Sequence, residues 1–331
     1  MPDSIDLGVL PAVLASVGYG LSDVLGGSVV RRHSTAALAL WAQVAGLVVL
    51  ATAAAAQRPA VTATALAWGA GAGVVGAVGV LAFYTALQRG RTSVVAPVAG
   101  TGVLLPVLAG VVVGEPLSWR TGLGVAAAVA GVLLVATAPE PTDPEPTEPA
   151  GRPMRRTDRP VPGRAQPVPE DDGCVPRQRA GDDRSSVVLA VGAATAFGSF
   201  FIVLEQATAS AAVPGPGRTS LDTALVVALA VQLGALAVTL LAATRHTRAC
   251  LRPERSLLLA ATAVGLLDVA ADVLVTLAVD RGPLAVVGPL ASLDPVVSVL
   301  VATLVLGERL RLLPALGVLL ALGGTVLVAV G

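Results

Sequence analysis

The chain has 331 residues, of which 54% are hydrophobic and only 13% are charged, and its mean hydropathy is +0.79. A soluble domain carries about twice that charged fraction, so the composition excludes an ordinary soluble fold. The formal net charge is zero, which gives no indication of nucleic-acid binding, and every residue of the Lys/Arg class is arginine. Mechanisms that depend on a phosphate-loop lysine or a Schiff-base lysine are therefore excluded.

Apolar stretches follow one another along the chain, each close to the roughly 20 residues that cross a bilayer as a helix. They cover residues 7–30, 35–56, 64–87, 92–113 and 120–138, and then 185–209, 221–244, 256–279, 283–306 and 312–330. The opening residues MPDSID lack a basic segment, so the first stretch is expected to be a retained span. The sequence predicts an all-α integral membrane protein with ten transmembrane helices, five in each half.

Residues 139–184 separate the two halves and differ completely in composition. They contain eleven prolines, eight arginines and ten acidic residues, without apolar periodicity. Such a segment cannot bury enough apolar surface to fold by itself. The predicted organisation is a first repeat at 1–138, a disordered linker at 139–184 and a second repeat at 185–331, with a regulatory or partner-binding linker as the alternative.

The last part of each half repeats the same sequence. Residues 114–136 and 307–329 are identical at eleven of 23 positions. The matched residues include Gly114/Gly307, Glu115/Glu308, Gly124/Gly317 and Gly131/Gly324. The matched glycines, seven residues apart, are expected to let helices pack closely in lipid. Each Gly-Glu pair ends a helix, and we expect its glutamate to fix a tight turn together with nearby arginines.

Further glycines of the first half allow two interpretations. Residues 71–76 spell the GxGxxG pattern of dinucleotide-binding loops, but they lie within an apolar span and no strand precedes them. The pattern therefore fails the structural context that the motif requires. Gly69 and Gly73 instead form a small-xxx-small pair, which is typical of close contacts between membrane helices.

Five is an odd number, so the second half is expected to enter the membrane in the opposite orientation to the first. Inverted repeats of this kind are common in secondary transporters. Ten of the fourteen arginines outside the linker fall on the side opposite the termini. The positive-inside rule therefore places both termini outside the cell.

Prolines interrupt corresponding apolar stretches of the two halves. Pro97 and Pro106 lie in the fourth predicted helix, and Pro289 and Pro295 in the ninth. A proline within a helix removes one N–H and frees a carbonyl four residues earlier, and paired interruptions point to a central binding site in repeat transporters. The alternative interpretation is a pair of structural kinks covered by neighbouring helices.

Five carboxylates fall inside predicted spans: Asp23, Glu205, Asp268, Asp272 and Asp294. An acidic side chain at that depth costs at least about 2.5 kcal/mol and marks a cavity, an ion path or a partner. Asp268 and Asp272 share one face of the eighth predicted helix, and Asp294 precedes the interrupting Pro295. We expect the pair on the eighth helix to retain at least one proton, because two neighbouring carboxylates cannot both ionise cheaply. Glu205 is interpreted as a residue that reaches the membrane interface.

The repeated Gly-Glu, the preceding runs ALQRGRTSVVAPVAG and LAVDRGPLAVVGPLASLDP, and the glycine-rich helix that follows resemble the EamA family of the drug/metabolite transporter superfamily. The second copy is closer to the family pattern, because Val103 stands where that copy has Pro295. The resemblance implies a ten-helix transporter, often an exporter of amino acids or other small metabolites. It also implies cytoplasmic termini, which disagrees with the arginine distribution, and the orientation stays open.

Together these patterns predict a secondary transporter, an exporter of small organic metabolites, amino acids or drugs, in the bacterial cytoplasmic (inner) membrane. The expected partners are membrane lipids, a small-molecule substrate and, as one option, protons, with no cofactor, no metal and no nucleic acid. The oligomeric state stays open, with a monomer as the simplest arrangement. The alternatives are a lipid- or sugar-carrier translocase of similar build, an intramembrane enzyme and a membrane scaffold. The enzyme is disfavoured because HExxH, GxSxG and lysine are missing from the sequence.

Overall fold

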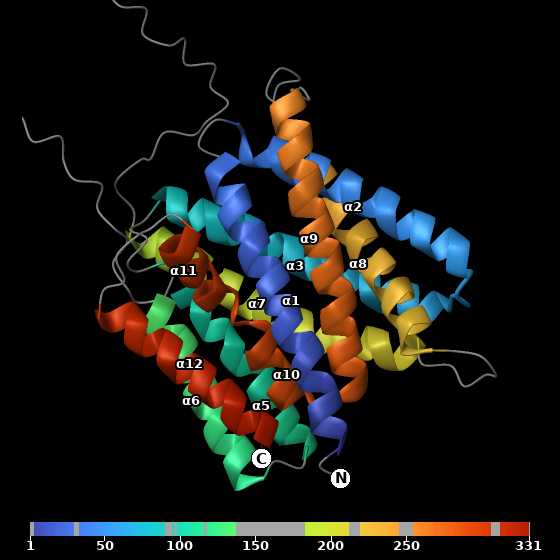
Figure 1. Ribbon diagram of the computed structural model, residues 1–331. Coiled ribbons are helices and arrows are strands. Elements are labelled where there is room, and N and C mark those ends of the chain that lie inside the picture. Colours follow the sequence, from blue (N-terminus) through green and yellow to red (C-terminus); the bar gives the residue numbers. More distant parts are fainter. Residues whose placement is uncertain are drawn as a thin grey trace, which may run out of the picture.

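The computed structural model describes residues 3–29, 33–89, 95, 98–115, 118–136, 183–211, 219–244, 254–305 and 312–330. Within these ranges the chain is all-helical and forms no strand (Figure 1). The first half contains α1 Asp3–Val29, α2 Thr35–Gln57, α3 Ala63–Arg89, the 3-10 turn η1 Thr101–Val103, α5 Leu104–Val113 and α6 Trp119–Ala136. The second half contains α7 Asp183–Ala211, α8 Ser220–Ala243, α9 Arg255–Arg281, α10 Leu284–Ala291, α11 Asp294–Val305 and α12 Leu312–Val330. The predicted linker lies outside the described residues, except for its last two positions, which begin α7.

Six of the described helices are long and apolar enough to cross a membrane, namely α1, α2, α3, α7, α8 and α9. They correspond to the first three predicted spans of each half. The fourth and fifth spans of each half appear as shorter apolar helices, 98–113, 119–135, 284–298 and 315–328. The structure therefore supports a multi-pass membrane protein, while the prediction of ten full spans remains a prediction.

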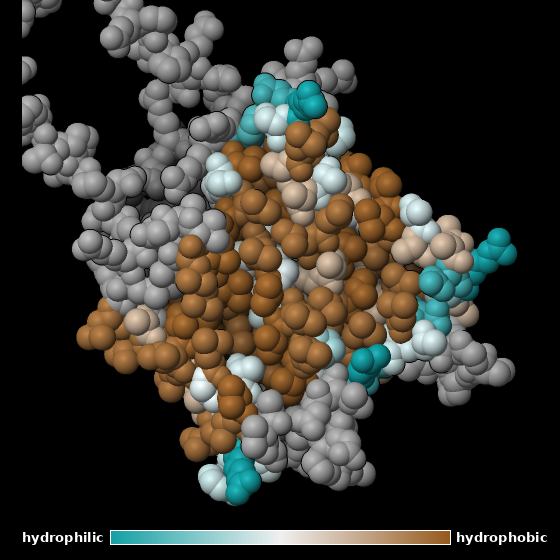
Figure 2. Space-filling view, viewed as in Figure 1, coloured by the Kyte–Doolittle hydropathy of each residue, from teal (hydrophilic) through white to brown (hydrophobic). Residues whose placement is uncertain are grey.

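The outer surface of the bundle is apolar. Figure 2 shows an almost continuous hydrophobic face across the helices, with polar residues gathered at its edges. Several large side chains are almost fully exposed, including Val112 at 85% and Leu304 at 80%. Contiguous apolar patches larger than a few hundred Å² are unusual on soluble monomers. This surface is suited to contact with lipid.

Helices α2 and α8 begin with hydroxyl caps that their sequences specify. The Ser34 side chain accepts a hydrogen bond from the Ala37 N–H at 3.1 Å. At α8, Thr219 and Asp222 form a capping box, in which the Thr219 N–H donates to Asp222 Oδ2 at 2.9 Å. Such caps satisfy N–H groups that have no partner within the helix. Both second helices of the halves are thus started in the same way.

Corresponding helices of the two halves make corresponding contacts with the other half. Helix α1 packs on α9 and α11, whereas α7 packs on α3 and η1; α2 packs on α9, and α8 packs on α3. The same contact recurs at residue level: a Cβ on Gly20 would meet the carbonyl of Asp294, and a Cβ on Gly198 would meet the carbonyl of Gly102. The first helix of each half therefore packs on the third and fourth segments of the other half.

Glycines allow the closest helix contacts, as their spacing predicted. In α6 and α12, a Cβ on Gly124 would lie 2.8 Å from the Gly324 carbonyl, and Gly131 and Gly317 face each other's backbone in the same way. Gly73 lies against the carbonyl of Val231 in α8. Its GxGxxG segment is continuous helix within α3, so the dinucleotide interpretation is rejected by the structure as well.

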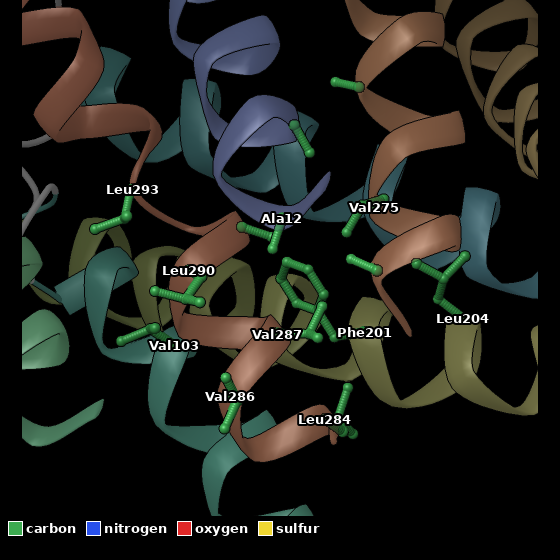
Figure 3. Close-up of a cluster of buried hydrophobic side chains, with 14 of the residues drawn as sticks. Ala12, Val103, Phe201, Leu204, Val275, Leu284, Val286, Val287, Leu290 and Leu293 are labelled. Carbon is green, nitrogen blue, oxygen red and sulfur yellow. The ribbon is translucent and has the colours of Figure 1, made fainter. Parts of the chain in front are cut away.

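Helix α10 occupies the centre of the apolar core. All eight of its residues are buried. Figure 3 shows Leu284, Val287 and Leu290 of α10 among Phe201 of α7, Val103 of η1 and side chains of other helices. Helix α10 contacts helices of both halves, namely α1, α5, α6, α7 and α9.

Candidate functional site

Four of the described carboxylates converge where α1, α9 and α11 meet. Asp23 lies on α1, Asp268 and Asp272 lie one turn apart on α9, and Asp294 is the first residue of α11. Asp23 interacts electrostatically with both Asp294 and Asp268, and Asp268 interacts with Asp272. The structure thus brings together the four aspartates that the sequence singled out from three separate helices.

Two hydroxyls of α1 hold the carboxylates of α9. The Tyr19 hydroxyl donates a hydrogen bond to Asp272 Oδ1 at 2.6 Å, and the Ser22 side chain is hydrogen bonded to Asp268. Tyr19 and Ser22 are three residues apart and their partners are four apart, so the two hydrogen bonds join the antiparallel helices α1 and α9 at successive turns. The sequence analysis missed both hydroxyls. The signal was the i,i+4 spacing of Tyr19 and Asp23, which places them on one face of α1.

The break between α10 and α11 carries the fourth carboxylate. Helix α10 ends at Ala291, where Ser292 donates from its N–H to the Gly288 carbonyl at 3.1 Å. Asp294 then lies in the first turn of α11, where a carboxylate interacts favourably with the helix dipole. Pro295 follows at a position where a helix tolerates proline. The predicted interruption of the ninth apolar stretch is therefore present, and Pro289 is accommodated inside α10.

Helix α1 packs directly on this break. A Cβ on Gly20 would lie 2.6 Å from the Val297 Cβ and 2.9 Å from the Asp294 carbonyl, so only glycine allows α1 to approach so closely. The Ser298 hydroxyl donates to the Gly20 carbonyl at 3.3 Å. These contacts place Tyr19 and Asp23 beside the start of α11.

The corresponding region of the first half is apolar. Gly76, Val80 and Gly102 stand at the positions of Asp268, Asp272 and Asp294, and Phe201 stands at the position of Asp23. There Gly76 packs against the Phe200 ring and Gly102 against the Ala194 backbone. The related halves therefore make one polar site and one packed, apolar counterpart. Pro106 is buried in α5, and Pro97 lies outside the described residues.

The four carboxylates keep some accessible surface, and the described arginines lie elsewhere. Asp23 is exposed and Asp268, Asp272 and Asp294 are partly exposed. Every arginine whose side chain is described is exposed, and none is among the groups that interact with these aspartates. Within the described part of the chain, no group of three or more His, Cys, Asp or Glu residues is arranged to hold a metal ion. Among the described residues, none supplies a positive charge to these four aspartates.

Glu115 has backbone partners that the sequence did not predict. Gly114 does form the tight turn that the sequence predicted, with a φ of 84°. The Glu115 carboxylate accepts hydrogen bonds from the backbone N–H groups of Leu284 and Ala285, and an arginine partner stays a prediction. Glu205 is half-buried on α7 and interacts electrostatically with Glu115. The equivalent Gly307 and Glu308 lie outside the described residues.

These features define an all-helical, multi-pass membrane protein with a carboxylate site at a helix break. The sequence pattern of the EamA-like transporter family matches residues 6–137 and 184–330, so each half carries the pattern by itself. The chain belongs to the EamA-like transporter family. This is a family of drug/metabolite transporters, which supports a role in membrane transport and is consistent with a non-enzymatic protein.

Solved structures share this fold. One, described as "Crystal structure of protein", aligns with a TM-score of 0.66 over 98% of this chain and 96% of its own, at 18% sequence identity. At that identity the likeness shows the fold alone. No curated protein matches the chain.

Proposed function

We propose that this protein is a proton-coupled secondary transporter that exports small organic metabolites, amino acids or drugs across the bacterial cytoplasmic membrane. The observation that carries the proposal is the convergence of Asp23, Asp268, Asp272 and Asp294 between α1, α9 and the α10–α11 break. We assign the first three to proton or cation exchange. Asp294 is the group closest to the substrate, because it begins the half-helix α11.

The charge balance of the site supports coupling. Carboxylates close together in a low-dielectric environment repel one another when ionised, and burial disfavours the charged form further. The site reaches neutrality by binding protons or by binding a cationic group of a substrate. Since both compete for the same oxygens, binding of one displaces the other, and this exchange couples substrate movement to a proton gradient.

The corresponding contacts between the two halves support alternating access. If the two halves cross the membrane in opposite orientations, the packing of α1 on α9 and that of α7 on α3 are the two versions of one arrangement. A rocking motion that loosens one pair and tightens the other would expose the site alternately to the two sides. The broken helix at the centre is the kind of segment from which repeat transporters form their sites.

Reconstitution into proteoliposomes tests the proposal. The vesicles contain a pH-sensitive dye, carry an imposed pH gradient, and receive a panel of amino acids, primary amines and cationic dyes one at a time. We expect at least one compound to dissipate the gradient through the wild-type protein, and the Asp268→Asn/Asp272→Asn variant to lose this effect. Glu254→Gln is the matched control, because Glu254 is exposed and its side chain does not cap α9.

The results separate the roles of the aspartates. Compound uptake that persists in the double variant but no longer responds to pH would support the assignment of Asp268 and Asp272 to coupling. Full pH-driven transport by the double variant would contradict it. A wild-type protein that moves no compound of any class, although it is folded and correctly inserted, would count against a transporter of these solutes.

A further inference from the structure

A carboxylate of the first half holds the start of a helix in the second half. Glu115 Oε1 accepts a hydrogen bond from the Leu284 N–H at 2.7 Å, and Oε2 accepts one from the Ala285 N–H at 2.8 Å. These are the first two residues of α10, where N–H groups have no partner within the helix. The preceding residue, Pro283, has no side-chain oxygen that could cap them. The cap therefore comes from a residue 169 positions earlier in the chain.

The end of α5 is built to deliver this carboxylate. Gly114 adopts the left-handed conformation, and the Glu115 N–H donates to the Gly110 carbonyl at 3.0 Å, as in a glycine-terminated helix end. Gly110 also leaves the space that the carboxylate occupies, because a Cβ there would contact Glu115 Oε2 and Ala285. Three features of the first half, at Gly110, Gly114 and Glu115, thus serve one contact with the second half.

We propose that Glu115 is a latch between the two halves. Its hydrogen bonds to the N-terminal end of α10 must break before the interior can open at that end. Two hydrogen bonds from successive N–H groups to one carboxylate are directional, so they hold the closed arrangement. They join separate segments rather than residues of one helix, so they can break without unfolding either helix. Glu205 of α7 lies close enough to interact with Glu115, and repulsion between like charges opposes the closed arrangement.

The latch also positions the carboxylate site. Helix α10 runs from the Glu115 contact at one end to the break before Asp294 at the other, a length of about 12 Å for eight residues. Because the helix is short and continuous, a displacement of its first turn is transmitted to the break. Glu115 is therefore a positioning residue for Asp294 and does not touch the substrate. This role rests on the proposed function, since only a transport cycle requires two arrangements of the halves.

The test measures opening directly, without a substrate. In a full-length background with Cys174→Ser and Cys250→Ser, a single cysteine replaces Leu284, which is 2% exposed beside the latch. The protein is reconstituted in lipid nanodiscs, and the rate of modification by a small water-soluble maleimide is measured. We expect Glu115→Gln to raise this rate by about tenfold or more, the factor that corresponds to loss of one hydrogen bond to a charged group.

Two controls distinguish a latch from general loosening. A cysteine at Leu257, 1% exposed at the opposite end of α9, should stay protected in the Glu115→Gln variant. Asp222→Asn, which removes a cap formed within one half, should leave the Leu284→Cys rate unchanged. The Leu284→Cys protein with Glu115 intact supplies the reference rate and is itself a check on folding.

Each outcome decides the proposal. Selective acceleration at Leu284→Cys supports the latch, even if no transported compound is found, so failure of the proposed function is recognised separately. An unchanged rate in Glu115→Gln overturns the latch. Equal acceleration at Leu284→Cys and Leu257→Cys also overturns it, because Glu115 would then be a general stabilising cap. If Glu115→Gln does not fold, spin labels at Val113→Cys and Arg281→Cys in the Glu115 background must show two distances between the halves, and a single distance overturns the proposal.

Discussion

Replacing Tyr19 by phenylalanine removes one oxygen atom from the carboxylate site and leaves the ring in place. The second half already has phenylalanine at the corresponding position, Phe197, so the equivalent helix α7 folds with a phenylalanine side chain there. The lost interaction is the 2.6 Å hydrogen bond to Asp272. A partly exposed bond to a carboxyl group contributes about 1–1.5 kcal/mol net, which corresponds to a fall in melting temperature of about 2–6 °C.

A double-mutant cycle isolates this contribution. The wild type, Tyr19→Phe, Asp272→Leu and the double variant are melted in the same detergent, with intrinsic tryptophan fluorescence as the signal. Once Tyr19→Phe has removed the donor, Asp272→Leu can no longer break this hydrogen bond. Its effect on stability in that background should then be only the change in burial at position 272. We expect a coupling energy of about 1–1.5 kcal/mol. Additive effects of the two substitutions would refute the reasoning that this bond joins α1 to α9.

Four further predictions follow from the site, the packing and the sequence. The Asp268→Asn/Asp272→Asn variant should be at least as stable to heat as the wild type, because it removes two burial costs; a clear loss on melting would contradict this. Gly73→Val should lower stability by about 3 kcal/mol or more, because its Cβ falls on the Val231 carbonyl, whereas Gly122→Ala, with open space beside it, should fold normally; equal melting temperatures would refute this. Reporter fusions at the two termini should lie on one side of the membrane and a fusion within 145–180 on the other, and a shared side would mean that the span count is wrong. Replacing residues 145–180 by a short Gly/Ser linker should leave the yield of folded protein nearly unchanged, since loop closure depends weakly on length, and a large loss would show that the segment docks on the helices.

The sequence predicted the local features of this fold because those features depend on short spacings. The apolar stretches of membrane length, the glycines that face each other in α6 and α12, and the break before Asp294 are each specified by neighbouring residues. The placement of Asp268 and Asp272 on one face follows from helix geometry alone. The family was also recognised correctly from its repeated motifs.

The sequence could not predict which helices meet. The bond between Tyr19 and Asp272 spans 253 positions and exists because α1 packs on the third helix of the other half, not on its neighbours in sequence. The backbone partners of Glu115 were not predicted, because charge complementarity is visible in a sequence, whereas unpaired N–H groups at the start of α10 are not. Ten full spans stay a prediction, because the fourth and fifth apolar stretches of each half form shorter helices.

The packed counterpart of the site limits how this protein can vary. Around Gly73, Gly102 and Gly198 the backbones of different helices touch, so any larger residue there would separate the helices, whatever its polarity. At the carboxylate site, Asp23, Asp268, Asp272 and Asp294 keep accessible surface, although α1 also packs tightly on α11 at Gly20. Engineering of substrate range should therefore sample the accessible positions beside the four aspartates on α1, α9 and α11, and keep Gly20 and the contact glycines of α3 and α7.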